Sequence, residues 1–261
     1  MSSYVGRHAA LYDTFYSDKP YDNEAAFVHH CLTRFGLKDT KRLLEVACGT
    51  GSHAFALERY GYQITATDYS EDMIEVARSK AVEKKSTVTF SQADMTNLDN
   101  VEGTFDAAIS LFDSIGYVQT NERLTQTFNQ VRQRLNPGGV FVFEFWHAAA
   151  MIPHHDALRI RRWTTEEGTL LRVSKTSLNV ARQISEVHYT IYELSKDGTY
   201  KCFEETQSNR YFLLQEMSYI ITSCGFEPVT WFAGFTESEL INEETWHIVA
   251  VARTSSTQKR I

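Results

Sequence analysis

The sequence is poor in cysteine and has no excess of positive charge, and both shortages exclude classes of protein. Four of its 261 residues are cysteine, with no C-x-x-C pair and no zinc-binding spacing. Neither a disulfide framework nor a metal site is therefore expected. The formal net charge is −7, whereas proteins that bind the nucleic-acid backbone usually present a basic face. We therefore expect no nucleic-acid partner.

Long apolar runs are missing as well. No segment approaches the length of a membrane span, and residues 1–20 contain no apolar core of a secretory signal. These absences predict no membrane contact and a cytoplasmic location with reduced thiols. The last residues, 256–261, resemble a frayed tail.

Short apolar segments alternate regularly with amphipathic ones over the first 146 residues. Strands are predicted at 42–48, 63–70, 88–94, 105–115 and 139–146, and helices at 22–35, 52–60, 70–85 and 121–135. Strands that alternate with helices at this spacing indicate βαβ units and a parallel, doubly wound Rossmann-like α/β sheet.

The pattern changes after Trp146. Residues 158–214 alternate like antiparallel strands, and the last of these segments is expected to return to the main sheet. A helix at 215–226 and a closing strand at 246–254 follow. The predicted organisation is an α/β domain of residues 1–146 and 203–255, with a β-rich, acceptor-binding insertion at 147–202.

The stretch "LLEVACGTGSHAFAL" leads from a strand through a glycine pair into a helix. Gly49, Gly51 and Ala54 fit the pattern G-x-G-x-x-G/A, which alone is a weak sign of a dinucleotide site. In open α/β sheets, ligands bind at the carboxyl ends of the strands. Asp68 stands at the end of the second strand, where a carboxylate can accept both ribose hydroxyls.

Two further acidic residues decide which adenosine cofactor is expected. Asp94 with Met95 offers an acceptor and a backbone N–H to an adenine edge, at the end of the third strand. Glu45, just ahead of the glycine loop, would repel the diphosphate of NAD. It suits the sulfonium and ammonium groups of S-adenosylmethionine, which is therefore the predicted cofactor.

Four segments in order, "LLEVACGTG", "TATDYSEDMIEVAR", "SQADM" and "LNPGGVFVFEF", resemble the motifs of class I S-adenosylmethionine-dependent methyltransferases. The resemblance implies a seven-stranded sheet, six strands parallel and the last antiparallel. By the same resemblance Glu45, Ala47, Gly49 and Gly51 belong to the methionine end of the cofactor and Asp68 to its ribose. The remaining implied positions are Tyr69, Met73, Asp94 and Met95 around the adenine, and Leu111 and Phe112 at the channel to the methyl group.

The chain is also similar, in patches along most of its length, to small-molecule methyltransferases that act on the amino group of nucleotide-linked amino sugars. That similarity implies that Tyr12 and Tyr21 fold over the site, Tyr21 on the cofactor, and that Trp146 faces the acceptor. The sequence departs from it in two places. Tyr117 stands where relatives often have histidine after "SIG", and the acidic loop "FTESELINEETW" lacks an arginine that some relatives carry.

The residues that bind the acceptor or move its proton have alternative interpretations. Tyr117 and His147 are the candidates for handling its proton, with wall packing and an exposed loop histidine as the alternatives. Arg159 and Arg161 share one face of a predicted strand and suit phosphate, as does Lys175 beside Arg172 in the insertion, although a solvated sheet face fits them equally.

The predicted function is therefore methyl transfer to a small-molecule acceptor, the amino group of a nucleotide-linked amino sugar. An O-methyltransferase of a sugar or phenolic metabolite is the nearest alternative. An NAD-dependent oxidoreductase and a non-catalytic cofactor-binding module are the remaining ones. The sequence is also compatible with a homodimer.

Overall fold

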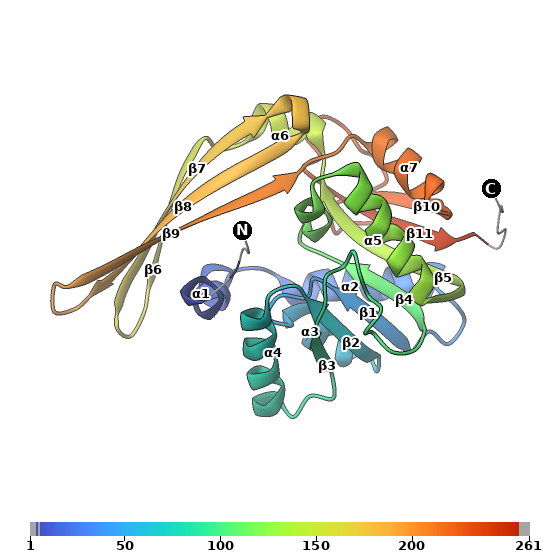
Figure 1. The fold of residues 1–261 in the computed structure, drawn as a ribbon, viewed down its shortest axis with the longest axis horizontal. Coiled ribbons are helices and arrows are strands. Elements are labelled where there is room, and N and C mark those ends of the chain that lie inside the picture. Colours follow the sequence, from blue (N-terminus) through green and yellow to red (C-terminus); the bar gives the residue numbers. More distant parts are fainter. Residues whose placement is uncertain (1–3, 5, 256–261) are drawn as a thin grey trace.

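Two β-sheets organise the chain, as the computed structural model shows for residues 4 and 6–255 (Figure 1). The predicted tail at 256–261 lies outside these described residues. The larger sheet has the order β10-β11-β5-β4-β1-β2-β3, with β11 antiparallel to both of its neighbours. Its strands are β1 (Arg42–Val46), β2 (Gln63–Asp68), β3 (Thr89–Gln92), β4 (Phe105–Ser110), β5 (Leu135–Trp146), β10 (Phe226–Ala233) and β11 (His247–Thr254). The predicted seven-stranded fold is confirmed.

Helices cover both faces of this sheet because its strands are apolar on both sides. Leu43 and Leu44, neighbours on β1, belong to the two separate cores. The helices of the first core are α2 (Tyr21–Phe35), α3 (Ser52–Glu58) and α4 (Glu71–Lys84), and those of the second are α5 (Asn121–Arg134) and α7 (Leu214–Ser223). The alternation of strand side chains therefore builds a three-layer structure.

Helix α4 begins where the sequence predicts. The side chain of Ser70 accepts the N–H of Met73 at 3.3 Å, so Ser70 is the N-cap. This cap fixes the turn between β2 and α4, and Asp68 stands at the start of that turn.

The insertion forms the second sheet, as predicted. Its strands run in the order β6 (Leu158–Thr164), β7 (Gly168–Asn179), β8 (Ile184–Ser195) and β9 (Tyr200–Arg210), all antiparallel. The expectation that the last segment returns to the main sheet is wrong. Strand β9 pairs with β8 from Arg210 to Tyr200 because a tight turn joins them. The strand that enters the large sheet, beside β11, is β10. The predicted boundary at 203 therefore falls inside β9.

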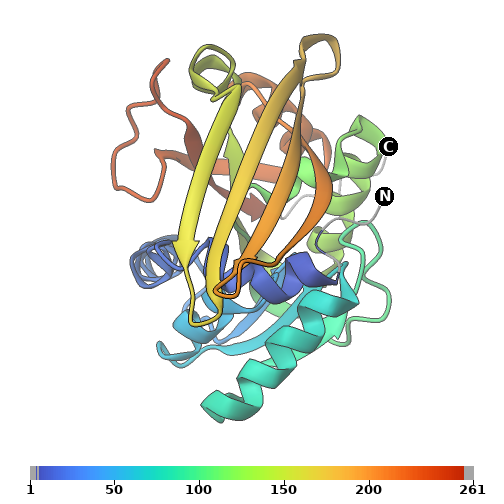
Figure 2. The ribbon, with the colours of Figure 1, turned by 90° about the vertical axis from the view of Figure 1, so that its left-hand side faces the viewer.

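Helix α1 (Arg7–Phe15) lies under the four-stranded sheet (Figure 2). Leu11 and Phe15 pack with Leu170 of β7 and Ile191 of β8. Arg7 also donates two hydrogen bonds to the Glu193 carboxylate, at 2.7 and 2.5 Å. The N-terminal segment thereby joins the second sheet to the main domain.

The remaining short elements are α6 (Ala148–His154) and the 3₁₀ turns η1 (Ser114–Val118) and η2 (Val180–Arg182). Within residues 4 and 6–255, no helix is both long enough and apolar enough to cross a membrane.

Candidate functional site

A cavity of about 420 Å³ lies at the carboxyl ends of β1, β2 and β4, as expected for an open α/β sheet. Tyr4 and Tyr12 of the N-terminal segment line it together with the loops that follow the strands. The predicted cofactor residues that line it are Tyr21, Ala47, Gly49, Asp68, Tyr69, Met73, Asp94, Met95 and Leu111. Two others, Glu45 and Gly51, are not part of the lining.

The two glycines of the loop have different surroundings. Gly49 has φ +55°, and a Cβ there would lie 3.9 Å from the ring of Tyr12. Gly51 has φ +80°, and a Cβ there would lie 2.6 Å from the ring of Phe90. Gly51 is thus required for packing between loop and strand, whereas Gly49 leaves the loop backbone open to a ligand.

Asp68 organises the glycine loop and the next helix. Its Oδ2 accepts the N–H of Gly49 at 2.8 Å and its Oδ1 accepts the N–H of Ser70 at 2.9 Å. Burial raises the pKa of Asp68. The backbone hydrogen bonds favour the charged form and act in the opposite direction, but burial is the larger effect. Each carboxylate oxygen has further lone pairs, so the group can also accept ligand hydroxyls.

Glu45 of β1 stands two residues before Ala47, which lines the cavity. Glu45 is 2% exposed, and its Oε2 is buried with no hydrogen-bond partner among the described residues. Burial and the nearby Asp68 raise the pKa of Glu45 to about 8. A buried carboxyl without a cation stays protonated. The sulfonium and ammonium groups of S-adenosylmethionine would supply the missing charge, so the residues fit this cofactor.

This raised pKa predicts how stability depends on pH. In the ligand-free protein Glu45 keeps its proton up to pH 8, whereas in the unfolded chain it titrates at about 4.3. Its contribution to stability is therefore complete below about pH 4.3 and is lost as the pH rises to 8. Glu45→Gln should raise the melting temperature at pH 8 by a few degrees, since 1 kcal/mol is worth about 2–4 °C at this size.

The same variant should change little at pH 4, where the Glu45 carboxyl is protonated in the folded protein and mostly protonated in the unfolded chain. Thermal melts of the wild type and the variant at the two pH values measure this difference. An equal change at both would show that Glu45 is not protonated in the ligand-free site.

At the other end of the cavity, Asp94 is held by its own turn. Its Oδ1 accepts hydrogen bonds from the backbone and hydroxyl of Thr96, at 2.9 and 2.8 Å, and its Oδ2 pairs with Arg123 at 3.2 Å. Burial alone would raise the pKa of Asp94, but these contacts outweigh it and lower the pKa. Asp94 is an ionised acceptor there, and Arg123, which also lines the cavity, was not predicted.

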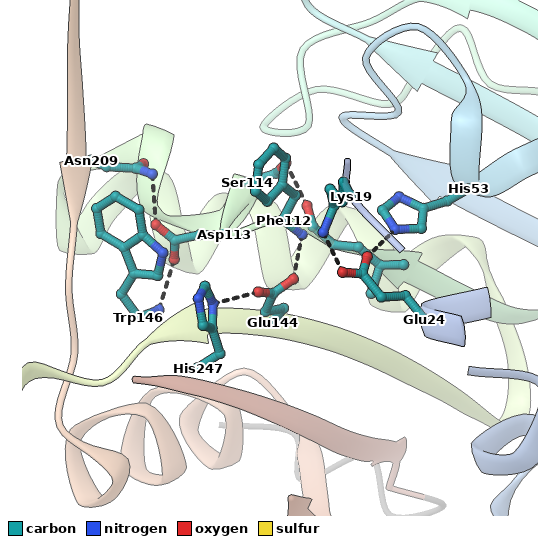
Figure 3. A network of polar contacts seen from close by, with 11 residues as sticks. Lys19, Glu24, His53, Phe112, Asp113, Ser114, Glu144, Trp146, Asn209 and His247 are labelled. Carbon is teal, nitrogen blue, oxygen red and sulfur yellow. Dashed lines mark hydrogen bonds and ion pairs between the residues drawn. The ribbon is translucent and has the colours of Figure 1, made fainter. Parts of the chain in front are cut away.

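The turn after β4 is strained and is held by carboxylates from below. Phe112 and Asp113 have φ +58° and +54°, a region that non-glycine residues rarely adopt. Figure 3 shows Glu144 of β5 under this turn, with Oε2 accepting the Phe112 N–H at 2.6 Å. His247 lies 2.6 Å from Oε1 of Glu144. These contacts fix the residues expected at the channel to the methyl group.

Asp113 ties the same turn to the second sheet. Its Oδ1 accepts the N–H of Trp146 at 2.8 Å, and its Oδ2 accepts the side-chain N–H of Asn209 at 2.6 Å (Figure 3). Asp113 and Asn209 are both buried. A side-chain hydrogen bond therefore joins β9 directly to the turn that follows β4.

A second charged group lies on the other side of Phe112. The Lys19 ammonium lies 4.3 Å from the Phe112 ring centroid and pairs with Glu24, and His53 lies 2.6 Å from the other Glu24 oxygen (Figure 3). His53 also lines the cavity. The basic groups of this cluster are thus already matched with a carboxylate.

The two predicted proton-handling residues have different places. Tyr117 lines the cavity, and its hydroxyl contacts the hydroxyl of Tyr4 and Oε1 of Gln207. His147 lies outside the lining, with Nδ1 3.1 Å from the carbonyl of Thr245. Burial lowers the pKa of His147 despite this contact. Its catalytic role stays a prediction.

Of the residues predicted for the acceptor, only Tyr12 lines the cavity. Trp146 packs edge-to-face on Trp246, with ring centroids 6.2 Å apart. Arg159 and Arg161 lie on β6, on the same side as Trp163, and Arg161 pairs with Asp18 at 2.6 Å. Lys175 of β7 is exposed.

Several site residues were missed because their partners are far away in sequence. Tyr4, Lys19, Glu24 and His53 carry no motif that marks them. Glu144 did carry a signal, since it is an acid in the middle of the apolar segment "VFVFEFW". A buried carboxylate on a central strand indicates a specific partner.

A family model described as "Methyltransferase domain" matches residues 43–139. The chain is 28% identical over 231 residues to YqeM of Bacillus subtilis (strain 168), which is named as a methyltransferase, covering 88% of this chain and 90% of that one. It is 32% identical over 193 residues to dTDP-3-amino-3,4,6-trideoxy-alpha-D-glucopyranose N,N-dimethyltransferase of Streptomyces venezuelae, covering 72% and 78%. A solved S-adenosylmethionine-dependent methyltransferase from Clostridium acetobutylicum ATCC 824 superposes with a TM-score of 0.80 at 18% identity, covering 96% and 98%, and this likeness concerns the fold.

Proposed function

The chain belongs to the class I S-adenosylmethionine-dependent methyltransferases, and from this premise we propose that its acceptor is the amino group of a nucleotide-linked amino sugar. The relative from Streptomyces venezuelae is named for an acceptor of this kind. When bound, the cofactor supplies a methyl group activated by its sulfonium. The reaction then requires an acceptor lone pair aligned with that methyl group.

The observation that supports an amine is the shortage of bases around the cavity. Among the described residues of the lining, His53 is the one histidine, and it is paired with Glu24. The phenols of Tyr4, Tyr12 and Tyr117 have pKa values raised by burial, so they stay protonated. Apart from Asp68 and Asp94, which are assigned to the cofactor, no described lining group is therefore poised to remove a proton from a hydroxyl.

An amine with a pKa near neutrality does not need such a group, because a useful fraction is already the free base. A phenol or sugar hydroxyl must lose its proton as it reacts, which favours a positioned general base. The residues of this cavity therefore match an amine better than a hydroxyl.

The chain's own contribution to the rate is alignment and exclusion of water. Tyr4, Tyr12 and Tyr117 form a continuous group of rings, with centroids 5.5 Å apart for Tyr4 and Tyr12 and 5.8 Å for Tyr4 and Tyr117. Phe112 is fixed by Glu144 and carries Lys19 on its face. Correct alignment of two reactants supplies up to about 7–11 kcal/mol.

Removal of either predicted proton-handling group should therefore cost little. We expect Tyr117→Phe and His147→Ala each to lower kcat by less than about tenfold with an amino-sugar acceptor at slightly alkaline pH. That loss is below the roughly 10²–10⁴-fold that general-base catalysis contributes. Steady-state kinetics with a saturating amino-sugar nucleotide measure it.

A loss of about a thousandfold in either variant, with the cofactor affinity unchanged, would contradict the amine proposal. It would identify a required base and favour a hydroxyl acceptor. The affinity for S-adenosylhomocysteine, measured by calorimetry, separates this outcome from damage to the cofactor site.

A further inference from the structure

Arg172 of β7 is a buried cation, and no carboxylate in residues 4 and 6–255 forms an ion pair with it. The residue is 5% exposed, and its Nε and Nη1 are buried with no hydrogen-bond partner. Its guanidinium carbon lies 4.8 Å from the ring centroid of Phe15 and 5.1 Å from those of Trp163 and Tyr189. Ring faces attract a cation but leave these N–H donors unmatched.

The neighbouring strand adds positive charge on the same side. Arg161 of β6 is the register partner of Arg172, and Arg159 is the partner of Ser174, which is buried like Arg172. Within the described residues, Asp18 is the one carboxylate that forms an ion pair with any of these three arginines, and it pairs with Arg161. This half of the sheet surface therefore carries more cations than anions.

The other half of the same surface is already neutralised. Glu193 of β8 pairs with Arg7, and Glu205 of β9 lies 2.8 Å from His8, both from α1. Lys201 of β9, the register partner of Glu193, is exposed, whereas the unmatched cation Arg172 of β7 is buried.

Arg172 also lies close to the turn after β4, which is expected at the channel to the methyl group. Its guanidinium carbon is 5.6 Å from the ring centroid of Tyr16, and that ring is 5.0 Å from the ring of Phe112. The Tyr16 ring therefore lies between Arg172 and the turn that follows β4. Phe112 lines the cavity and Arg172 does not, so an acceptor that extended past Phe112 toward β7 would approach Arg172.

We infer that Arg172 binds a phosphate of the acceptor, with Arg159 and Arg161 beside it, so that the nucleoside diphosphate lies on β6 and β7. This inference rests on the proposed function. The guanidinium fork matches phosphate oxygens, and a phosphate would satisfy the unpaired N–H groups. Lys175, predicted for this purpose, is exposed and alternates away from Arg172 and Ser174, so it faces the opposite side.

Binding of thymidine diphosphate to protein saturated with S-adenosylhomocysteine tests the inference by calorimetry. Arg172→Met should raise the dissociation constant about 10- to 100-fold, the range of a charge-assisted contact. Arg172→Lys, which keeps the charge without the fork, should raise it severalfold. Arg162→Met is the matched control, because Arg162 is exposed and alternates away from Arg161, and it should bind like the wild type.

The inference fails if thymidine diphosphate does not bind the wild type, if Arg172→Met binds it as tightly as the wild type, or if Arg162→Met loses as much affinity. An unchanged affinity for S-adenosylhomocysteine shows that a variant is folded. If Arg172→Met is not folded, the affinity of Arg172→Lys for thymidine diphosphate tests the inference instead.

The proposed function fails separately. If Arg172→Met loses thymidine diphosphate binding but the wild type methylates no amino-sugar nucleotide, the phosphate-site inference stands and the proposed amine acceptor is wrong. If the wild type methylates an amino-sugar nucleotide and Arg172→Met does so with an unchanged KM, the amine acceptor stands and the phosphate-site inference is wrong.

Discussion

Replacement of Asp68 by alanine should raise the dissociation constant for S-adenosylmethionine at least about 100-fold, as expected from the loss of two charge-assisted hydrogen bonds to the ribose. The carboxylate also holds the Gly49 and Ser70 N–H groups, so the variant loses the ligand contacts and the position of the loop together. Isothermal calorimetry with S-adenosylmethionine measures the change. Asp68 lines the cavity at the end of β2, where this ligand is expected.

Glu75→Ala is the matched control for Asp68, because Glu75 is an exposed carboxylate on the adjacent helix α4. It should bind the cofactor like the wild type. Gly49→Val should lose binding as Asp68→Ala does, since a β-branched residue at φ +55° is strained and projects toward Tyr12. Near-normal affinity in both Asp68→Ala and Gly49→Val would refute the cofactor site as described.

The second large effect is expected at Tyr12. The residue is 9% exposed and lines the cavity, and its ring contacts those of Tyr4 and Tyr16, with centroids 5.5 and 4.7 Å apart. Tyr12→Ala should lower kcat roughly 100-fold, because a misplacement of about 1 Å can cost that much. Single-turnover kinetics, with cofactor and acceptor both saturating, measure the chemical step directly.

Tyr12→Phe keeps the ring and removes the hydroxyl, so it should stay within about threefold of the wild type, the effect of one weak hydrogen bond. If Tyr12→Ala also stayed within tenfold, alignment by the aromatic cover would not be the main source of the rate. If Tyr12→Phe lost as much as Tyr12→Ala, the hydroxyl and not the ring would be the essential part.

The cofactor side of the site was predictable because each of its residues stands at a fixed place in a local pattern. Strand, glycine loop and helix are contiguous, and Asp68 follows the next strand at its carboxyl end. The start of helix α4 near residue 70 was predictable for the same reason. Even here Gly51 illustrates a limit, since its contact with Phe90 depends on the packing of β3 and cannot be read from the loop.

The acceptor side was less predictable because long-range contacts build it. Tyr4 and Tyr117 touch across 113 residues, and Asp113 and Asn209 across 96. Helix α1 was missed because "RHAALYDTF" has only a short apolar face, which becomes buried once the second sheet covers it. Strand β9 was assigned to the wrong sheet because its alternation fits either one, and only pairing with β8 decides.

The central claim, methyl transfer to an amine without a dedicated base, is tested most directly by a matched pair of acceptors. A thymidine-diphosphate-linked 3-amino sugar and its 3-hydroxy counterpart are each incubated with the wild-type enzyme and S-adenosylmethionine, and the products are quantified by mass spectrometry. The account predicts a methylated product from the amino sugar and at least about a hundredfold lower kcat/KM with the hydroxy sugar, consistent with the 10²–10⁴-fold that a missing base costs. Equal or faster methylation of the hydroxy sugar would contradict it.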